Sequence, residues 1–70
     1  MIGFDEINRR LGFHPATDET IPKFESNRAF FIDLADWLDH NLPDGREKSL
    51  ALTALQEALM WANASVACQA

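Results

Sequence analysis

The sequence has little of what usually stabilises a small protein. Its 70 residues include a single cysteine, Cys68, so no disulfide can form within the chain. The two histidines, His14 and His40, do not combine with Cys68 in a spacing typical of zinc sites, so we expect no metal and no cofactor. We expect one domain over residues 1–70. A core of this size is marginal, and oligomerisation is the remaining means of stabilising it.

Positive charge and long apolar runs are also scarce. Six Lys and Arg residues stand against eleven Asp and Glu residues, which gives a net charge of −5. DNA and RNA polymers require many phosphate contacts, so we expect neither as a partner, whereas a small ligand with two or three phosphates needs only a few cations. No stretch approaches the ~20 apolar residues of a membrane span, and the N-terminus lacks the features of a signal peptide. We therefore expect a soluble cytoplasmic protein without a membrane partner.

Residues suited to catalysis are also missing. The sequence shows no Ser/His/Asp or Cys/His arrangement of the kind that activates a nucleophile. Paired carboxylates such as Asp33 and Asp36 fit a solvated helix face, and Cys68 is interpreted as a small apolar residue without a role. We expect that the protein is not an enzyme and has no catalytic residue.

The residues that are present indicate an all-α protein, in which a short N-terminal helix precedes an antiparallel two-helix hairpin. Thr20 is the expected N-cap of the second helix, and Gly12 is expected to end the first. Pro43-Asp44-Gly45 forms a tight turn between the long helices, where Asp44 and Glu47 have the spacing of a capping box. We expect the last residues, from about Ala67, to fray. The expected helices are 3–10, 21–41 and 46–64.

The third helix carries two apolar stripes, and its hairpin partner can cover only one of them. The stripe expected in the core comprises Leu52, Leu55, Leu59, Ala62 and Val66. The neighbouring stripe, of mostly small residues, comprises Ala51, Ala54, Ala58 and Trp61. Phe24, Phe31 and Leu38, seven residues apart along the second helix, form the matching core stripe. We therefore predict that the second stripe is an interface between copies of the chain in a homo-oligomer.

Two groups of residues could bind a ligand. Phe13 and His14 precede Pro15 in a loop rich in turn formers, where an aromatic ring either pins the loop to the hairpin or offers a platform on which a base stacks. Lys23 and Arg28 lie on the first two turns of the second helix. Each is either a solvated surface cation or a phosphate contact, and Arg28 is the stronger candidate because it lies among phenylalanines.

Several segments together resemble a known family, the phage-encoded anti-CBASS cyclic-nucleotide sponges, whose helical hairpin also occurs in a Thoeris anti-defence sponge family. The similarity covers roughly residues 12–66. The segments are His14-Pro15, Arg28, Pro43-x-Gly45-Arg46-Glu47, Ser49-Leu50-Ala51-Leu52-Thr53-x-Leu55-x-Glu57-Ala58 and Met60-Trp61-Ala62-Asn63-Ala64.

The resemblance implies a compact protomer that interlocks into dimers, three of which form a hexamer in the host cytoplasm. It implies that cyclic dinucleotides, 3′,3′-cGAMP among them, bind in pockets between protomers, and that cyclic trinucleotides bind in separate pockets near the threefold axis. The signal is sequestered without being cleaved, so the CBASS effector is not activated.

Carried onto this chain, the resemblance implies that Phe13 or His14 stacks on a base and that Lys23 or Arg28 holds a phosphate. Arg46 and Lys48 are weaker candidates for the second pocket. Relatives often stack with tyrosine, which this chain lacks; Phe13 can stack but cannot donate a hydrogen bond. The alternative hypothesis is a helical hairpin whose exposed stripe caps or inhibits a protein partner.

Overall fold

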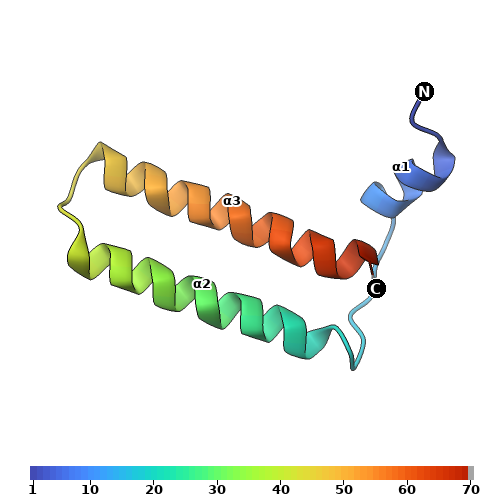
Figure 1. Cartoon of the computed structure of the whole chain (residues 1–70). Helices are drawn as coiled ribbons and strands as arrows, with labels where there is room; N and C mark the ends of the chain where they lie inside the picture. The colour runs from blue at the N-terminus through green and yellow to red at the C-terminus, as the bar shows by residue number, and fades with distance from the viewer. Residues whose placement is uncertain (70) are drawn as a thin grey trace.

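The computed structural model describes residues 1–69, which form three α-helices and no strand. The helices are α1 (Phe4–Leu11), α2 (Ile21–Asn41) and α3 (Arg46–Gln69). α2 and α3 lie side by side and antiparallel, and α1 lies near the C-terminal end of α3 (Figure 1). The predicted all-α class and the order of the helices are therefore confirmed. None of the described helices is long and apolar enough to cross a membrane.

Gly12 ends α1, as the sequence predicts. Its N–H donates to the carbonyl oxygen of Asn8 at 2.7 Å. A Cβ atom at position 12 would lie 2.5 Å from that same carbonyl oxygen, a separation that real Cβ contacts essentially never show. Any larger residue would therefore have to shift the last turn of α1.

The start of α2 differs from the prediction that Thr20 caps the helix with its side chain. Thr20 does precede the first residue of α2, but its backbone is already helical and its side chain makes no capping bond to the helix. Its hydroxyl instead accepts the N–H of Thr17 at 2.8 Å, and the Thr17 hydroxyl accepts the N–H of Thr20 at 3.2 Å. This reciprocal pair is the geometry of a capping box one turn earlier. It leaves Thr20 as the buried residue of the described chain, with 2% of its surface exposed.

Both ends of α3 also differ from expectation. Among the described residues no hydrogen bond joins the Asp44 carboxylate to a backbone N–H of α3; this carboxylate accepts from Lys48 Nζ at 2.8 Å instead. The expected capping box of Asp44 and Glu47 is therefore not formed. The helix continues to Gln69, so the residues from Ala67 that were expected to fray lie within it as far as the structure describes them.

Half-buried side chains at heptad spacing join α2 to α3. One polar pair lies among them, with Asn27 Nδ2 donating to Asn63 Oδ1 at 3.2 Å. Leu52, predicted in the core, is 50% exposed in the single chain. The half-buried apolar residues of the contact are Phe24, Phe31, Ala35, Leu38, Ala51, Leu55, Leu59, Ala62 and Val66.

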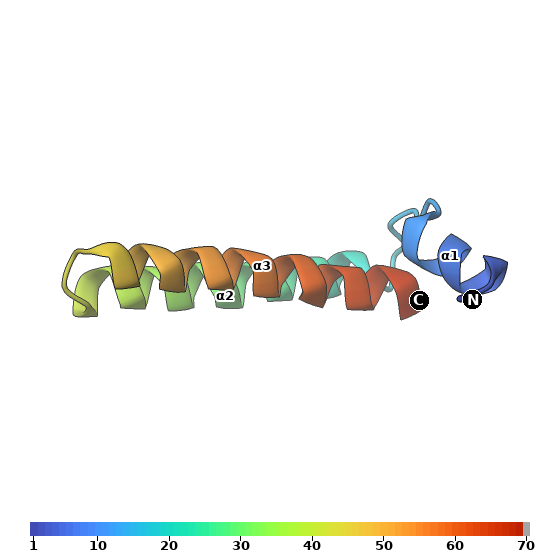
Figure 2. The same ribbon diagram turned by 90° about the horizontal axis from the view of Figure 1, so that it is seen from above.

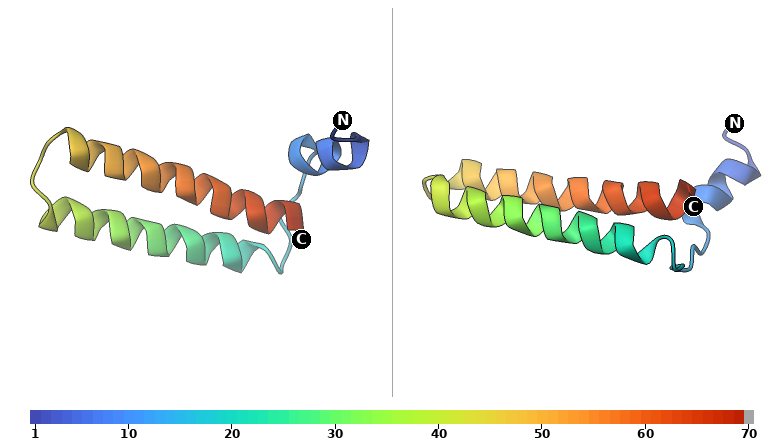
Figure 3. Two further views of the ribbon diagram at one scale, coloured as in Figure 1. Left: turned by 45° about the horizontal axis from the view of Figure 1, so that its top comes forward. Right: turned by 60° about the horizontal axis from the view of Figure 1, so that its bottom comes forward.

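The hairpin is a single layer of helices with no enclosed core. The Cα atoms of the chain, with α1 included, span 46 × 33 × 12 Å, and edge-on and tilted views show α2 and α3 side by side in one layer with α1 beyond their end (Figures 2 and 3). The radius of gyration is 15.4 Å, against about 11 Å for a compact chain of this length. No hydrophobic side chain of residues 1–69 is buried. The protomer by itself is therefore extended, not compact as the resemblance implies.

The exposed surface gives the same conclusion in terms of area. The chain exposes 5868 Å², whereas a folded monomer of 7.9 kDa exposes about 4,400 Å². The excess is about 1,400–1,500 Å² for each copy, against the about 800 Å² that each partner buries in a standard protein interface. A flat hairpin has nowhere within itself to bury this surface.

Candidate ligand-binding residues

The two candidate residues of the loop between α1 and α2, His14 and Phe13, have different surroundings. His14 is half-buried, and its Nε2 lies 2.6 Å from the carbonyl oxygen of Arg9. Because a carbonyl only accepts, this nitrogen carries the proton, and the ring ties the loop to the end of α1. Phe13, by contrast, is 90% exposed. Phe13 is therefore the aromatic ring of this loop that is open to a ligand.

Lys23 and Arg28 are both exposed on the first two turns of α2, and neither forms an ion pair within residues 1–69. Five residues of α-helix rotate a side chain by about 140° around the axis, so the two cations point to different sides of the hairpin. One copy of the chain therefore does not direct both cations at one phosphate. That each holds a phosphate stays a prediction.

The other two candidate cations lie at the hairpin turn and differ in their surroundings. Lys48 Nζ donates to Asp39 Oδ1 at 2.8 Å, to Asp44 Oδ1 at 2.8 Å and to the Asp39 carbonyl oxygen at 2.7 Å. These hydrogen bonds raise the pKa of Lys48 and lower the pKa of Asp39. Since an ammonium has three protons, a phosphate would have to displace one of these oxygens. Arg46 is exposed and forms no ion pair in the described chain.

The predicted interface stripe on α3 is largely open in the single chain. Ala51 is half-buried, whereas Ala54 and Ala58 are exposed and Trp61 is 69% exposed. On α2, Phe30, Leu34 and Trp37 share one face at i, i+4 and i+7 and are 76%, 45% and 57% exposed.

The other face of the hairpin is apolar as well. Ile32 points about 140–160° away from Phe30, Leu34 and Trp37 by helical rotation. It lines a groove of about 210 Å³ between the long helices with Leu52, Leu55 and Leu59. Both faces of the hairpin therefore expose apolar side chains.

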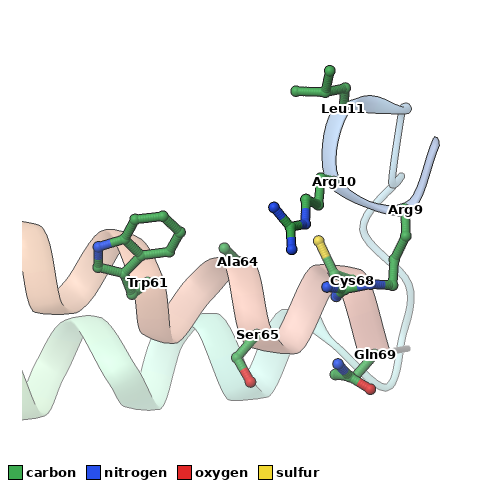
Figure 4. A pocket seen from close by; sticks show the side chains of 8 residues that line it. All are labelled: Arg9, Arg10, Leu11, Trp61, Ala64, Ser65, Cys68 and Gln69. Atoms are coloured by element: carbon green, nitrogen blue, oxygen red, sulfur yellow. The ribbon is translucent and has the colours of Figure 1, made fainter. Parts of the chain in front are cut away.

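Sequence reasoning missed a pocket between α1 and the C-terminal half of α3. It has a volume of about 690 Å³ and combines two arginines with an indole ring (Figure 4). The residues that line it are Arg9, Arg10, Leu11, Trp61, Ala64, Ser65, Cys68 and Gln69.

Glu6 holds both arginines of this pocket. Arg9 donates through Nε to Oε2 at 2.9 Å and through Nη2 to Oε1 at 2.7 Å, and Arg10 donates through Nε to Oε1 at 2.7 Å. The spacing of Glu6 three and four residues before the arginines was visible in the sequence. That these arginines line one pocket with Trp61 was not visible in the sequence, because it depends on the path of the loop.

The shared carboxylate gives a measurable pH signature. Hydrogen bonds from Arg9 and then Arg10 lower the pKa of Glu6 from 4.5 to about 2. A depressed pKa in the folded state means that the pairing stabilises α1 above pH 4.5 and is lost as the pH falls toward 2. We expect an NMR titration of the Glu6 side-chain carboxyl to show its midpoint near 2, and Arg9→Gln to raise that midpoint. A midpoint near 4.5 in the parent protein would show that the cluster does not form.

Comparison with known proteins gives one finding. A family profile described as "Acb2/Tad1, hairpin domain" matches residues 5–67, which is nearly the whole chain. The comparisons with curated proteins and with solved structures found no significant match.

Proposed function

The chain belongs to the Acb2/Tad1 hairpin domain family, and from this membership we propose that it is a phage anti-defence protein that acts as a cyclic-nucleotide sponge. It binds cyclic di- and trinucleotide immune signals such as 3′,3′-cGAMP in the host cytoplasm. It withholds them from the CBASS effector without cleaving them. The observation that carries the proposal is the family match over residues 5–67, which covers the loop with Phe13, α2, and α3 as far as residue 67.

The exposed apolar faces support assembly, with a hexamer built as a trimer of dimers. Phe30, Leu34 and Trp37 on one face and Ile32 and Leu52 on the other are all at least 45% exposed in the single chain. A flat protomer with two apolar faces has two surfaces on which to bind further copies. One type of contact would make the dimer, and a second type would join the dimers.

The accessible loop and helix residues support a dinucleotide pocket between copies. A cyclic dinucleotide presents two bases and two phosphates. Two copies related by a twofold axis present two Phe13 rings and two Arg28 guanidinium groups, so the symmetry of the ligand and of the pocket agree. Phe13 stacks on a base, and Arg28, with Lys23 as the second cation, holds the phosphates. His14 contributes by fixing the loop.

The hairpin turn supplies the cations for the second pocket. Arg46 is the open one, whereas Lys48 is held by two carboxylates in the single chain. Copies that meet around a threefold axis would bring three Arg46 side chains to one cyclic trinucleotide. Lys48 then takes part only if the ligand displaces Asp39 or Asp44.

Thermal shift with a panel of cyclic oligonucleotides tests the proposal. A ligand that binds only the folded state raises the Tm, and the rise increases with ligand concentration. We expect a rise with at least one cyclic dinucleotide, and none with its linear form at the same concentration. If no cyclic oligonucleotide raises the Tm, the sponge is contradicted, and the exposed apolar stripe would instead favour a module that caps a protein partner.

Phe13→Ala isolates the stacking contact. Stacking of a base on an aromatic ring contributes about 1–3 kcal/mol, so the variant is expected to bind a cyclic dinucleotide about five- to a hundredfold more weakly. Because Phe13 is 90% exposed, its removal is expected to leave the Tm of the ligand-free protein nearly unchanged. Isothermal titration calorimetry measures the affinity, and Phe13→Trp, which keeps an aromatic face, is the matched control. Equal affinity of Phe13→Ala and the parent would assign the base to another residue.

A further inference from the structure

We propose that the pocket between α1 and α3 is a second, separate binding site, and that it takes a nucleoside phosphate whose phosphate lies on Arg10 and whose base stacks on Trp61. The site shares no residue with the proposed cyclic-nucleotide sites built on Phe13, Lys23, Arg28 and the hairpin turn. Its volume of about 690 Å³ lies within the range of pockets that hold small molecules.

Charge makes this pocket an anion site in an acidic protein. Arg9 and Arg10 share the single carboxylate of Glu6, so the cluster keeps one unit of positive charge. Within residues 1–69 it is the place where two guanidinium groups pair with the same carboxylate. Since hydrogen bonds from both arginines hold the pKa of Glu6 at about 2, this charge does not change over the physiological range.

The hydrogen-bond geometry leaves Arg10 equipped for a phosphate. Only its Nε is used by Glu6, so the two terminal nitrogens keep four N–H donors, and the outer edge of the guanidinium is the edge that receives phosphate through two parallel bonds. Figure 4 shows the Arg10 side chain extending from α1 toward α3. Glu6 therefore orients the arginine without occupying the edge that would bind the ligand.

The remaining lining supplies a platform and polar donors for the rest of a nucleotide. Trp61 precedes the other lining residues of α3 and lies on the side that α1 faces (Figure 4), and it is 69% exposed in the single chain. Its Nε1 donates to Glu57 Oε1 at 3.3 Å, which fixes the indole while leaving its face open. The proposed site therefore gives to a ligand the indole that the sequence placed in the interface stripe, and leaves Ala54 and Ala58 for the contact between copies. Ser65 and Gln69 also line the pocket from α3, and their side chains can donate to ribose or base oxygens.

Tryptophan fluorescence tests the site directly. The chain has two tryptophans, so in the Trp37→Phe protein the emission reports Trp61 alone. We expect adenosine 5′-monophosphate to quench this emission in a saturable way, and saturating 3′,3′-cGAMP not to displace it. Arg10→Gln in the same background should weaken the binding about ten- to a hundredfold, with Arg10→Lys between the two. Thr53→Glu lowers the net charge by the same one unit on an exposed part of α3 outside the pocket and should leave the affinity unchanged.

Several results would overturn the proposal. They are the absence of saturable quenching at millimolar adenosine 5′-monophosphate, equal affinities of Arg10→Gln and the parent, and equal losses in Arg10→Gln and Thr53→Glu. Inorganic phosphate that binds as tightly as the nucleotide would equally overturn it, because Trp61 would then add nothing. If circular dichroism shows that Arg10→Gln does not fold, the affinity of Arg10→Lys tests the proposal instead. This variant keeps the positive charge but cannot form two parallel hydrogen bonds to a phosphate. Failure of the cyclic-nucleotide proposal would appear instead in the thermal shift, which the Arg10 variants leave unchanged.

Discussion

Ala58→Glu is expected to dissociate the protein into monomers or small species that unfold at much lower temperature. Ala58 is exposed in the single chain, and glutamate is a good helix former, so the hairpin of one copy tolerates the change. In an assembly that buries Ala54 and Ala58 of the predicted interface stripe, each copy would bury an unpaired carboxylate. That costs several kcal/mol per copy, which corresponds to at least a hundredfold loss of association for each interface.

Light scattering at micromolar concentration measures this result, and Thr53→Glu is the matched control. Thr53 is an exposed residue of the same helix and points about 140° away from Ala58 by helical rotation. The parent and Thr53→Glu are expected to have the same mass, a multiple of the 7.9 kDa chain and most simply six copies. A parent protein that is monomeric and stably folded would contradict the assembly, as would an Ala58→Glu protein with the mass of the parent.

Arg28→Gln is expected to produce the other large loss, this time in ligand affinity. Arg28 is exposed on α2 and forms no ion pair within residues 1–69, so its removal exposes no buried partner. A hydrogen bond to a charged group contributes about 1.5–3 kcal/mol, so one lost phosphate contact weakens binding about ten- to a hundredfold. Arg28→Glu should weaken it further, because it also repels the phosphate. Lys23→Glu tests the second cation in the same way.

Calorimetry with a cyclic dinucleotide checks this expectation, with light scattering on each variant to verify that the oligomer is intact. Thr53→Glu again lowers the net charge by one unit, as Arg28→Gln does, and should bind like the parent. If the Arg28 and Lys23 variants all bind like the parent, other residues contact the phosphates, and the membership of the family is unaffected.

The helices could be predicted from the sequence because each follows from local periodicity and from a nearby stop. Gly12 ends α1 and Pro43-Asp44-Gly45 separates α2 from α3, as expected. The cap of α2 could not be placed so well, since Thr17 and Thr20 are both capping residues and only the backbone path selects the reciprocal pair. The end of α3 was set too early, because alanine-rich helix carries no stop signal before the last residues of the chain.

The candidate site was less accessible to sequence reasoning, because it depends on contacts between distant segments. The sequence presented Phe13 and His14 as equivalent candidates; the hydrogen bond of His14 to the Arg9 carbonyl distinguishes them. The sequence does not show that Lys48 is paired. In the structure its Nζ binds the carboxylate of Asp39, which lies nine residues earlier on the other side of the turn. Arg9 and Arg10 were not among the candidates, because nothing in α1 alone indicates that they line a pocket with Trp61.

The most direct measurement of the sponge is the fate of its ligand. Cleavage of a phosphodiester needs a positioned nucleophile, usually activated by a base or a metal, and the sequence offers no recognisable arrangement for it. We expect 3′,3′-cGAMP incubated overnight with excess protein to disappear from the free pool and, after heat denaturation, to return intact, with unchanged chromatographic retention and undiminished activity on its effector. Recovery of linear dinucleotide or mononucleotides, at more than one equivalent per site, would show turnover and contradict sequestration.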